Sequence, residues 1–161
     1  MKTEIIDDFL PQTDFDIISG VFAGRQIAWT CVDDDPSQNG IQFCHMLYSK
    51  FEPCSPLWSL LAPIHSVLKP SAYSRVKANL QPKTEKIIQN NFHYDYANCI
   101  TSILYLNSNN GYTLFEDGTK IDSVANRLVT FDSNLNHTGA TCTDQPTRMV
   151  INFNYFKREL L

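Results

Sequence analysis

The spacing of apolar residues changes along the chain, from a helical period near the amino terminus to an alternating period in the second half. Residues 13–22 follow a proline and carry apolar side chains at helical spacing, which predicts a helix. Residues 55–68 open with Ser-Pro and carry one apolar stripe. A second helix is therefore predicted there, bent or split at Pro63.

From residue 73 onward the chain reads as short strands separated by the turn signals NSNNG, EDG, DSN and TDQP. The predicted strands cover residues 73–80, 101–106, 112–115, 128–131 and 148–155. Two further strands are predicted between the helices, over residues 27–32 and 43–48, with the polar run DDDPSQNG as the loop between them.

The last predicted strand, RMVINFNYF, has two chemically different faces, because alternate side chains of a strand point to opposite sides. One face is apolar and carries Met149, Ile151, Phe153 and Tyr155. The other is more polar and carries Arg148, Val150, Asn152 and Asn154. The pattern fits a strand that packs on the helices and turns its polar face into the protein. A surface strand with solvated asparagines fits it equally well.

Helices followed by many short strands are typical of a mostly β fold in which two antiparallel sheets form a jelly roll. We expect one domain over residues 1–161, since this length suits a single core. Within it, residues 1–72 are expected to supply helical support and the substrate entrance. Residues 73–158 are expected to form the jelly-roll core.

Composition narrows the class of protein further. Apolar residues make up 43% of the chain, so it should fold, and the net charge of −4 makes nucleic acid an unlikely partner. No run of residues is long and apolar enough for a membrane span, and the acidic start MKTEIIDDFL lacks the plan of a secretion signal. We expect a cytoplasmic protein whose five cysteines are reduced and mostly buried. The sequence does not indicate its oligomeric state.

The segment FHYDY carries the strongest chemical signal. In an extended segment, His93 and Asp95 project to the same side and can reach one ion. His137 ends a later strand-like run and offers a third ligand. Two histidines and one carboxylate form the facial triad of non-heme iron(II) oxygenases. A single His-x-Asp occurs easily by chance, and His45 and His65 are interpreted as structural. What adds weight is Arg148, whose planar fork suits a carboxylate.

Four stretches together resemble a known family: FHYD, TSILYLNSNNGYTLFEDG, NRLVTFDSNLNH and TRMVINFNYF. Over residues 75–156 the chain resembles the 2-oxoglutarate and iron(II)-dependent dioxygenases, in their prolyl 4-hydroxylase-like branch. It is also similar to small members found in marine phages, in which case the host cytoplasm would be its location. The resemblance implies a distorted jelly roll, also called a double-stranded β-helix. Its implied cofactor is iron(II), with 2-oxoglutarate and dioxygen as co-substrates and ascorbate as a candidate stimulant.

The resemblance also assigns roles to residues. His93, Asp95 and His137 match the catalytic metal ligands, and Arg148 matches the basic residue that pairs with the distal carboxylate of 2-oxoglutarate. Tyr105 matches a tyrosine whose hydroxyl helps to bind that carboxylate, with a core aromatic as the alternative. Further candidates for the same pocket are Asn79, Asn152 and Ile103.

Three departures limit what the resemblance implies. The nucleic-acid demethylases carry a second arginine where this chain has Asn154, which disfavours base demethylation. The presence of Asp95 disfavours the halogenases, which lack this carboxylate. The run RVKANL lacks a tyrosine that related prolyl hydroxylases carry before the triad, so co-substrate contacts from that strand stay open.

The implied reaction is hydroxylation of an unactivated C–H bond, coupled to conversion of 2-oxoglutarate to succinate and carbon dioxide. A peptidyl proline or another protein side chain is the first substrate hypothesis, and a free amino acid or small metabolite is the alternative. A catalytically inactive metal-binding module and a structural phage protein are hypotheses of another class. Four residues are candidates for shaping the substrate entrance, although a structural role is the simpler interpretation of each: Trp29, Gln42, His45 and Arg75.

Overall fold

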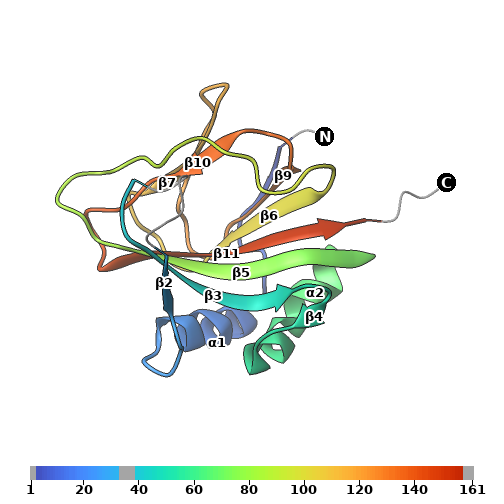
Figure 1. Cartoon of the computed structure of the whole chain (residues 1–161). Helices are drawn as coiled ribbons and strands as arrows, with labels where there is room; N and C mark the ends of the chain where they lie inside the picture. Colours follow the sequence, from blue (N-terminus) through green and yellow to red (C-terminus); the bar gives the residue numbers. More distant parts are fainter. Residues whose placement is uncertain (1–2, 33–38, 158–161) are drawn as a thin grey trace.

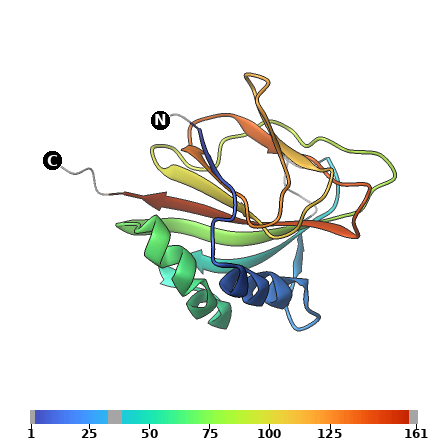
Figure 2. The same ribbon diagram turned by 180° about the vertical axis from the view of Figure 1, so that it is seen from behind.

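Two antiparallel sheets face each other in the computed structural model, which describes residues 3–32 and 39–157. The larger sheet has the strand order β1-β9-β6-β11-β5-β3-β2, with β4 paired to β3, and the smaller sheet has the order β10-β7-β8. The helices cover the outer face of the larger sheet, and the smaller sheet lies across its inner face (Figures 1 and 2). The predicted fold class, a mostly β jelly roll with supporting amino-terminal helices, is confirmed.

The elements follow one another along the chain with short connections. In the first half they are β1 (Glu4–Ile6), α1 (Gln12–Ala23), β2 (Thr30–Val32), β3 (Gln42–Ser49), β4 (Glu52–Pro53), the 3-10 helix η1 (Pro56–Leu61) and α2 (Ala62–Leu68). In the second half they are β5 (Ala72–Pro82), β6 (Ile100–Tyr105), β7 (Tyr112–Phe115), β8 (Lys120–Asp122), β9 (Leu128–Asp132), β10 (His137–Gly139) and β11 (Thr147–Phe156).

The central strand β11 separates the apolar core from the interior of the roll. It pairs with β5 on one side and β6 on the other, and eight of its ten residues are buried. Its apolar residues, from Met149 to Tyr155, join the core formed with Phe15, Ile18 and Phe22 of α1 and Ile64 of α2. The interpretation of RMVINFNYF as a strand with a helix-packed face and an interior polar face therefore holds, and the solvated-surface alternative is wrong.

Both predicted helices form. Residues 55–68 divide into η1 and α2 next to Pro63, because proline fits the first turn of a new helix but interrupts an existing one. The Ser55 hydroxyl caps η1 by accepting from Leu57 N at 3.1 Å. Residues 1–72 also supply strands β1, β2 and β3 to the larger sheet, so this part of the chain is more than a helical support.

Three local expectations need correction. Residues 27–32 form a strand only over Thr30–Val32, and most of the predicted loop DDDPSQNG lies outside the described residues. Four short strands, β1, β4, β8 and β10, were not predicted, since two or three residues carry too little alternation to register. The cysteines are free as expected, but Cys31 and Cys54 are exposed while Cys99 and Cys142 are buried.

Within the described ranges, none of the helices is long and apolar enough to cross a membrane.

Candidate metal centre

Two histidines meet because the segment before β6 runs antiparallel to β10. His93 N donates to His137 O at 3.0 Å and His137 N donates to His93 O at 2.9 Å, which makes the two residues directly opposed neighbours. Their ring centroids lie 4.9 Å apart. Apart from this bridge, residues 92–97 form no strand and Asp95 lies in a bend, so His93 and Asp95 come together without the extended backbone that the sequence argument used.

The three candidate ligands converge on one place. Donor atoms of His93, Asp95 and His137 all lie within 4.8 Å of one another, and Asp95 Oδ2 is 4.0 Å from His137 Nε2. Neighbouring ligands of one divalent ion lie roughly 3 Å apart, given bonds of about 2.1 Å at right angles. Rotation about side-chain torsions can close that difference. Two imidazoles and one carboxylate are a donor set that suits iron(II).

The imidazoles are held in the form that binds metal. The Nδ1 atom of His93 donates to Asn91 O at 3.1 Å, and that of His137 donates to Leu135 O at 3.0 Å. Since a carbonyl can only accept, each Nε2 keeps its lone pair free for an ion. Burial lowers the pKa of His137 more than the nearby Asp95 raises it, which favours the neutral ring.

The Asp95 carboxyl is kept ionised. Burial by itself raises its pKa, but the charge of Arg75, the His137 ring when it is protonated at low pH, and amide hydrogen bonds from Asn154 and Asn152 outweigh this and lower the pKa to about 2. Asp95 is therefore a carboxylate at neutral pH, as a metal ligand must be.

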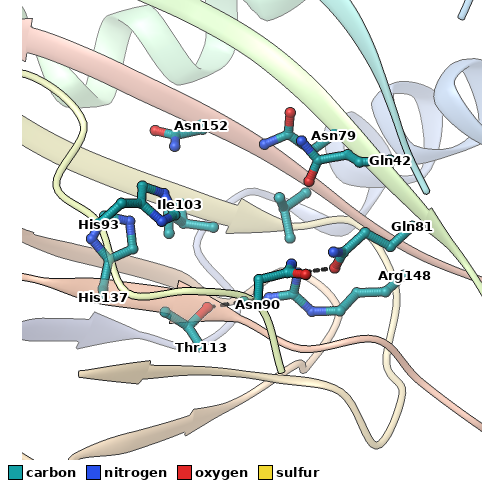
Figure 3. A pocket seen from close by; sticks show the side chains of 12 residues that line it. Gln42, Asn79, Gln81, Asn90, His93, Ile103, Thr113, His137, Arg148 and Asn152 are labelled. Carbon is teal, nitrogen blue, oxygen red and sulfur yellow. Dashed lines mark hydrogen bonds between the residues drawn. The ribbon is translucent and has the colours of Figure 1, made fainter. Parts of the chain in front are cut away.

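A polar cavity of about 60 Å³ extends from the two histidines to Arg148 (Figure 3). Side chains of both sheets face it, as do side chains of the segment between β5 and β6, which we call the crossing segment. They are Gln42, Asn79, Gln81, Asn90, His93, Ile103, Thr113, His137, Arg148, Val150 and Asn152, with the backbone of Gly139. Asn79, Ile103 and Asn152 are the residues predicted from the sequence for this pocket, and all three lie on its wall.

Arg148 is a buried cation without an acidic partner. Its guanidinium donates to Ser123 Oγ at 2.9 Å and to Thr113 Oγ1 at 3.2 Å, and more loosely to Gln81 Oε1 at 3.5 Å. Throughout residues 3–32 and 39–157, no carboxylate lies within ion-pair distance of it. Burial lowers its pKa, yet a guanidinium stays protonated at neutral pH. A buried unpaired charge is costly, so this end of the cavity suits an anion.

Two glycines leave space for this arginine. A Cβ at Gly111 would lie 2.7 Å from Arg148 Cδ and 2.9 Å from the Ala140 carbonyl oxygen. A Cβ at Gly139 would lie 3.4 Å from Arg148 Nη1. The first glycine admits the arginine stem, and the second leaves its charged end open to the cavity.

Tyr105 does not reach the cavity. It is fully buried, and its hydroxyl donates to Thr113 Oγ1 at 2.7 Å. Because Thr113 Oγ1 also accepts from Arg148, both of its lone pairs are used, and its own hydrogen can point into the cavity. The direct contact of Tyr105 with a carboxylate stays a prediction. Thr113, which was not predicted from the sequence, links the Tyr105 hydroxyl to the Arg148 guanidinium. It lines the cavity and lies opposite Gly139 in the β7–β10 pair.

Two buried acceptors face the cavity without a partner among the described residues. They are Asn79 Oδ1 and Asn152 Oδ1. The amide nitrogen of Asn152 donates to Asp95 Oδ2 at 3.0 Å, which fixes the orientation of its oxygen. Such orphan groups are rare in proteins and indicate that a polar ligand or water is needed there.

The entrance candidates divide into two kinds. Gln42 lines the cavity, and Arg75 pairs with Asp95 at 3.0 Å. His45 is structural, since its ring hydrogen-bonds Ala28 O and Ser55 Oγ, and Trp29 packs against the core. His65 is structural as well, with Nδ1 2.6 Å from the Tyr73 hydroxyl.

Sequence comparison identifies no relative: no family model matches the chain, and no curated protein is significantly similar. Solved structures are similar in fold. A Trichoplax adhaerens prolyl hydroxylase, in complex with a hypoxia inducible factor oxygen degradation domain peptide fragment, matches with a TM-score of 0.70 and 16% identity, over 96% of this chain and 83% of that one.

Two bacterial structures are similar as well. A Pseudomonas putida prolyl-4-hydroxylase gives a TM-score of 0.65 and 14% identity, covering 96% of this chain and 92% of that one. An oxidoreductase of the 2OG-Fe(II) oxygenase family from Burkholderia pseudomallei gives a TM-score of 0.71 and 12% identity, covering 98% of this chain and 86% of that one. At such identities the likeness establishes the fold, which is that of 2-oxoglutarate and iron(II) oxygenases. The expected likeness to marine phage members stays a prediction.

Proposed function

We propose that this chain is an iron(II)- and 2-oxoglutarate-dependent oxygenase that hydroxylates an unactivated C–H bond. One observation supports this above all: the two histidines of a His-Asp-His donor set line the same small cavity as a buried arginine that has no acidic partner among the described residues. A metal site alone fits many functions. The cation at the opposite end adds a second requirement, for a ligand that reaches from the metal to a buried positive charge.

The residues divide the work between the two ends. His93, Asp95 and His137 would hold the iron, and Arg148 would hold the far carboxylate of 2-oxoglutarate by charge-assisted hydrogen bonds. The Thr113 hydroxyl, which Tyr105 and Arg148 orient, would add a third donor to that carboxylate. When bound, the iron and co-substrate supply the oxidising power for reaction with dioxygen, and succinate and carbon dioxide are the co-products.

The cavity has a volume of only about 60 Å³, so most of the primary substrate would lie outside it. Phe92 and Tyr94 flank His93 and are 41% and 59% exposed. Exposed aromatic side chains beside a reactive centre suit contact with a peptide. Together with the peptide complex of the Trichoplax enzyme, they favour a peptidyl proline or another protein side chain as substrate.

A free amino acid or small metabolite is the second candidate, and the unpaired oxygens of Asn79 and Asn152 favour it. These atoms need N–H or O–H donors, which 2-oxoglutarate lacks and a peptidyl proline nitrogen cannot supply. A free amine or hydroxyl would satisfy them.

The test is succinate release with iron(II), 2-oxoglutarate and dioxygen, screened against proline-containing peptides, free amino acids and nucleotides. We expect basal turnover in the wild type, stimulated by the true substrate, and none in His93→Ala. Anaerobic addition of iron(II) and 2-oxoglutarate should also produce a weak visible charge-transfer band. An inactive binding module or a structural phage protein would give neither the band nor succinate, and that result would refute the proposal.

A further inference from the structure

The Asp95 carboxylate needs a support that the backbone does not provide. His93 and His137 are fixed by their bridge, but Asp95 lies in a bend beyond it and joins no strand. Its side chain is nevertheless 95% buried and makes three hydrogen bonds to other side chains. The position of this ligand is therefore set by the groups that donate to it.

The donors come from the two central strands. Arg75 Nη2 donates to Asp95 Oδ1, and Asn152 Nδ2 and Asn154 Nδ2 both donate to Asp95 Oδ2, each at 3.0 Å. Arg75 is itself held, because its Nε and Nη2 donate to Asn154 Oδ1 at 3.2 and 3.0 Å. Asn154 thus accepts from Arg75 and donates to Asp95, which links the three residues in a closed set.

The backbone is shaped to bring this set together. Arg75 and Asn154 are register partners on β5 and β11, but the next pair is Tyr73 with Tyr155, so the ladder has an irregularity there. The extra residue on β5 reverses the alternation of side chains. As a result Tyr73 packs in the apolar core, while Arg75, only two residues later, faces the interior of the roll.

Tyr96 covers the exposed side of the same guanidinium. Its ring centroid lies 4.8 Å from Arg75 Cζ, and the Arg75 side chain is only 17% exposed. Limiting water around an ion pair strengthens it. The pair thus differs from an ordinary surface salt bridge, which contributes little.

Counting lone pairs shows what this arrangement does to the ligand. A carboxylate has about four acceptor sites, and three of those on Asp95 are occupied by Arg75, Asn152 and Asn154. About one site is left for an ion, and it is on Oδ1, because Oδ2 already accepts from both asparagines. The set therefore both fixes the carboxylate and restricts it to a single oxygen ligand, leaving other coordination positions open.

We propose that Arg75 and Asn154 are positioning residues that hold Asp95 as a single-oxygen metal ligand. This inference rests on the proposed function, since it presumes that Asp95 binds the metal. Neither residue would touch the co-substrate. Their contribution would be to the affinity for the ion, where supporting hydrogen bonds to a ligand are typically worth roughly 10- to 100-fold.

The experiment measures the affinity of the full-length protein for manganese(II), a probe for the iron(II) site that is stable in air. Arg75→Met should weaken binding roughly 10- to 100-fold, and Arg75→Lys should recover part of the loss, since lysine keeps the charge without the fork. Asn154→Leu should weaken binding as well, and provides a second variant if Arg75→Met folds poorly.

Arg127→Met is the matched control. Arg127 makes a two-bond pair with Asp7, at 2.6 and 3.0 Å, on the surface away from the cavity. Its loss should leave manganese affinity within about twofold of the wild type even if the melting temperature falls. Cobalt(II) absorption adds a second readout, because a displaced Asp95 should alter the visible spectrum.

The outcomes separate the two proposals. Unchanged manganese affinity in both Arg75→Met and Asn154→Leu, or a loss no larger than that in Arg127→Met, overturns the positioning role while leaving the metal site intact. Failure of the wild type to bind manganese overturns the proposed function, and the positioning role with it.

Discussion

The role of Arg148 can be tested without knowing the primary substrate. The perturbation is Arg148→Met, which keeps the apolar stem and removes the guanidinium. In the ligand-free protein, this substitution should change the free energy of unfolding only slightly. The variant loses three hydrogen bonds, to Ser123, Thr113 and Gln81, worth about 1 kcal/mol each. It also removes a buried cation that has no acidic partner in the described part of the chain, and the two effects oppose each other.

The effect on 2-oxoglutarate binding should be large. Removing one member of a buried charge pair costs about 2–5 kcal/mol, which corresponds to roughly 30-fold to several-thousand-fold weaker binding. The affinity of Arg148→Lys for 2-oxoglutarate should lie between those of the wild type and Arg148→Met, because lysine keeps the charge but cannot offer two parallel donors. Manganese(II) binding should be unaffected, since Arg148 contacts none of the three metal ligands.

Thermal unfolding with manganese(II) and 2-oxoglutarate provides the assay. A ligand at 100 times its dissociation constant stabilises a protein by about 2.7 kcal/mol. For a chain of this size, about 2–4 °C per kcal/mol gives a rise in melting temperature of roughly 5–11 °C. We expect this rise in the wild type, and in Arg148→Met at the same concentrations a rise of at most about 2–3 °C, falling to essentially none at the upper end of the affinity loss. A variant that retains the full rise, with manganese still bound, would show that the carboxylate binds elsewhere.

Three further predictions concern single residues. Gly139→Ala should raise the KM for 2-oxoglutarate in succinate release while leaving manganese affinity unchanged, because the added Cβ would lie 3.4 Å from Arg148 Nη1; an unchanged KM would place the ligand elsewhere. Asp95→Ala should abolish succinate production, and full turnover in this variant would remove Asp95 from the metal site. Burial lowers the pKa of His65, so between the usual value of 6.5 and its lower folded value only the unfolded chain binds the proton. Stability should therefore fall as pH drops below about 6.5, less steeply in His65→Gln than in the wild type. Equal slopes in urea unfolding at several pH values would contradict this.

The fold was predictable because its strongest patterns coincide with its main layers. β11 alternates over its whole length, which predicted a helix-packed apolar face, but the pattern fitted a solvated surface strand equally well, and only the structure shows that both faces are buried. The short strands β8 and β10 were missed since three residues cannot establish a period. Their pairing is set by the sheet around them.

The site was predictable only where residue type is distinctive. His93, Asp95, His137 and Arg148 belong to types with few roles in a buried polar setting. The bridge between the two histidines depends on how distant segments align, which a single sequence does not encode locally. Thr113 was overlooked and Arg75 was considered only for the substrate entrance, because a threonine in a strand and an arginine near a strand end are common.

The way β11 is enclosed limits how this protein could diverge. Its outward side chains complete the helical layer, its inward ones hold Asp95 and the proposed anion site, and eight of its ten positions are buried. A replacement on the outward face disturbs the core, and a replacement on the inward face disturbs the site. New specificities would therefore have to arise in the exposed crossing segment around Phe92 and Tyr94, which can vary while the strand beneath it stays fixed.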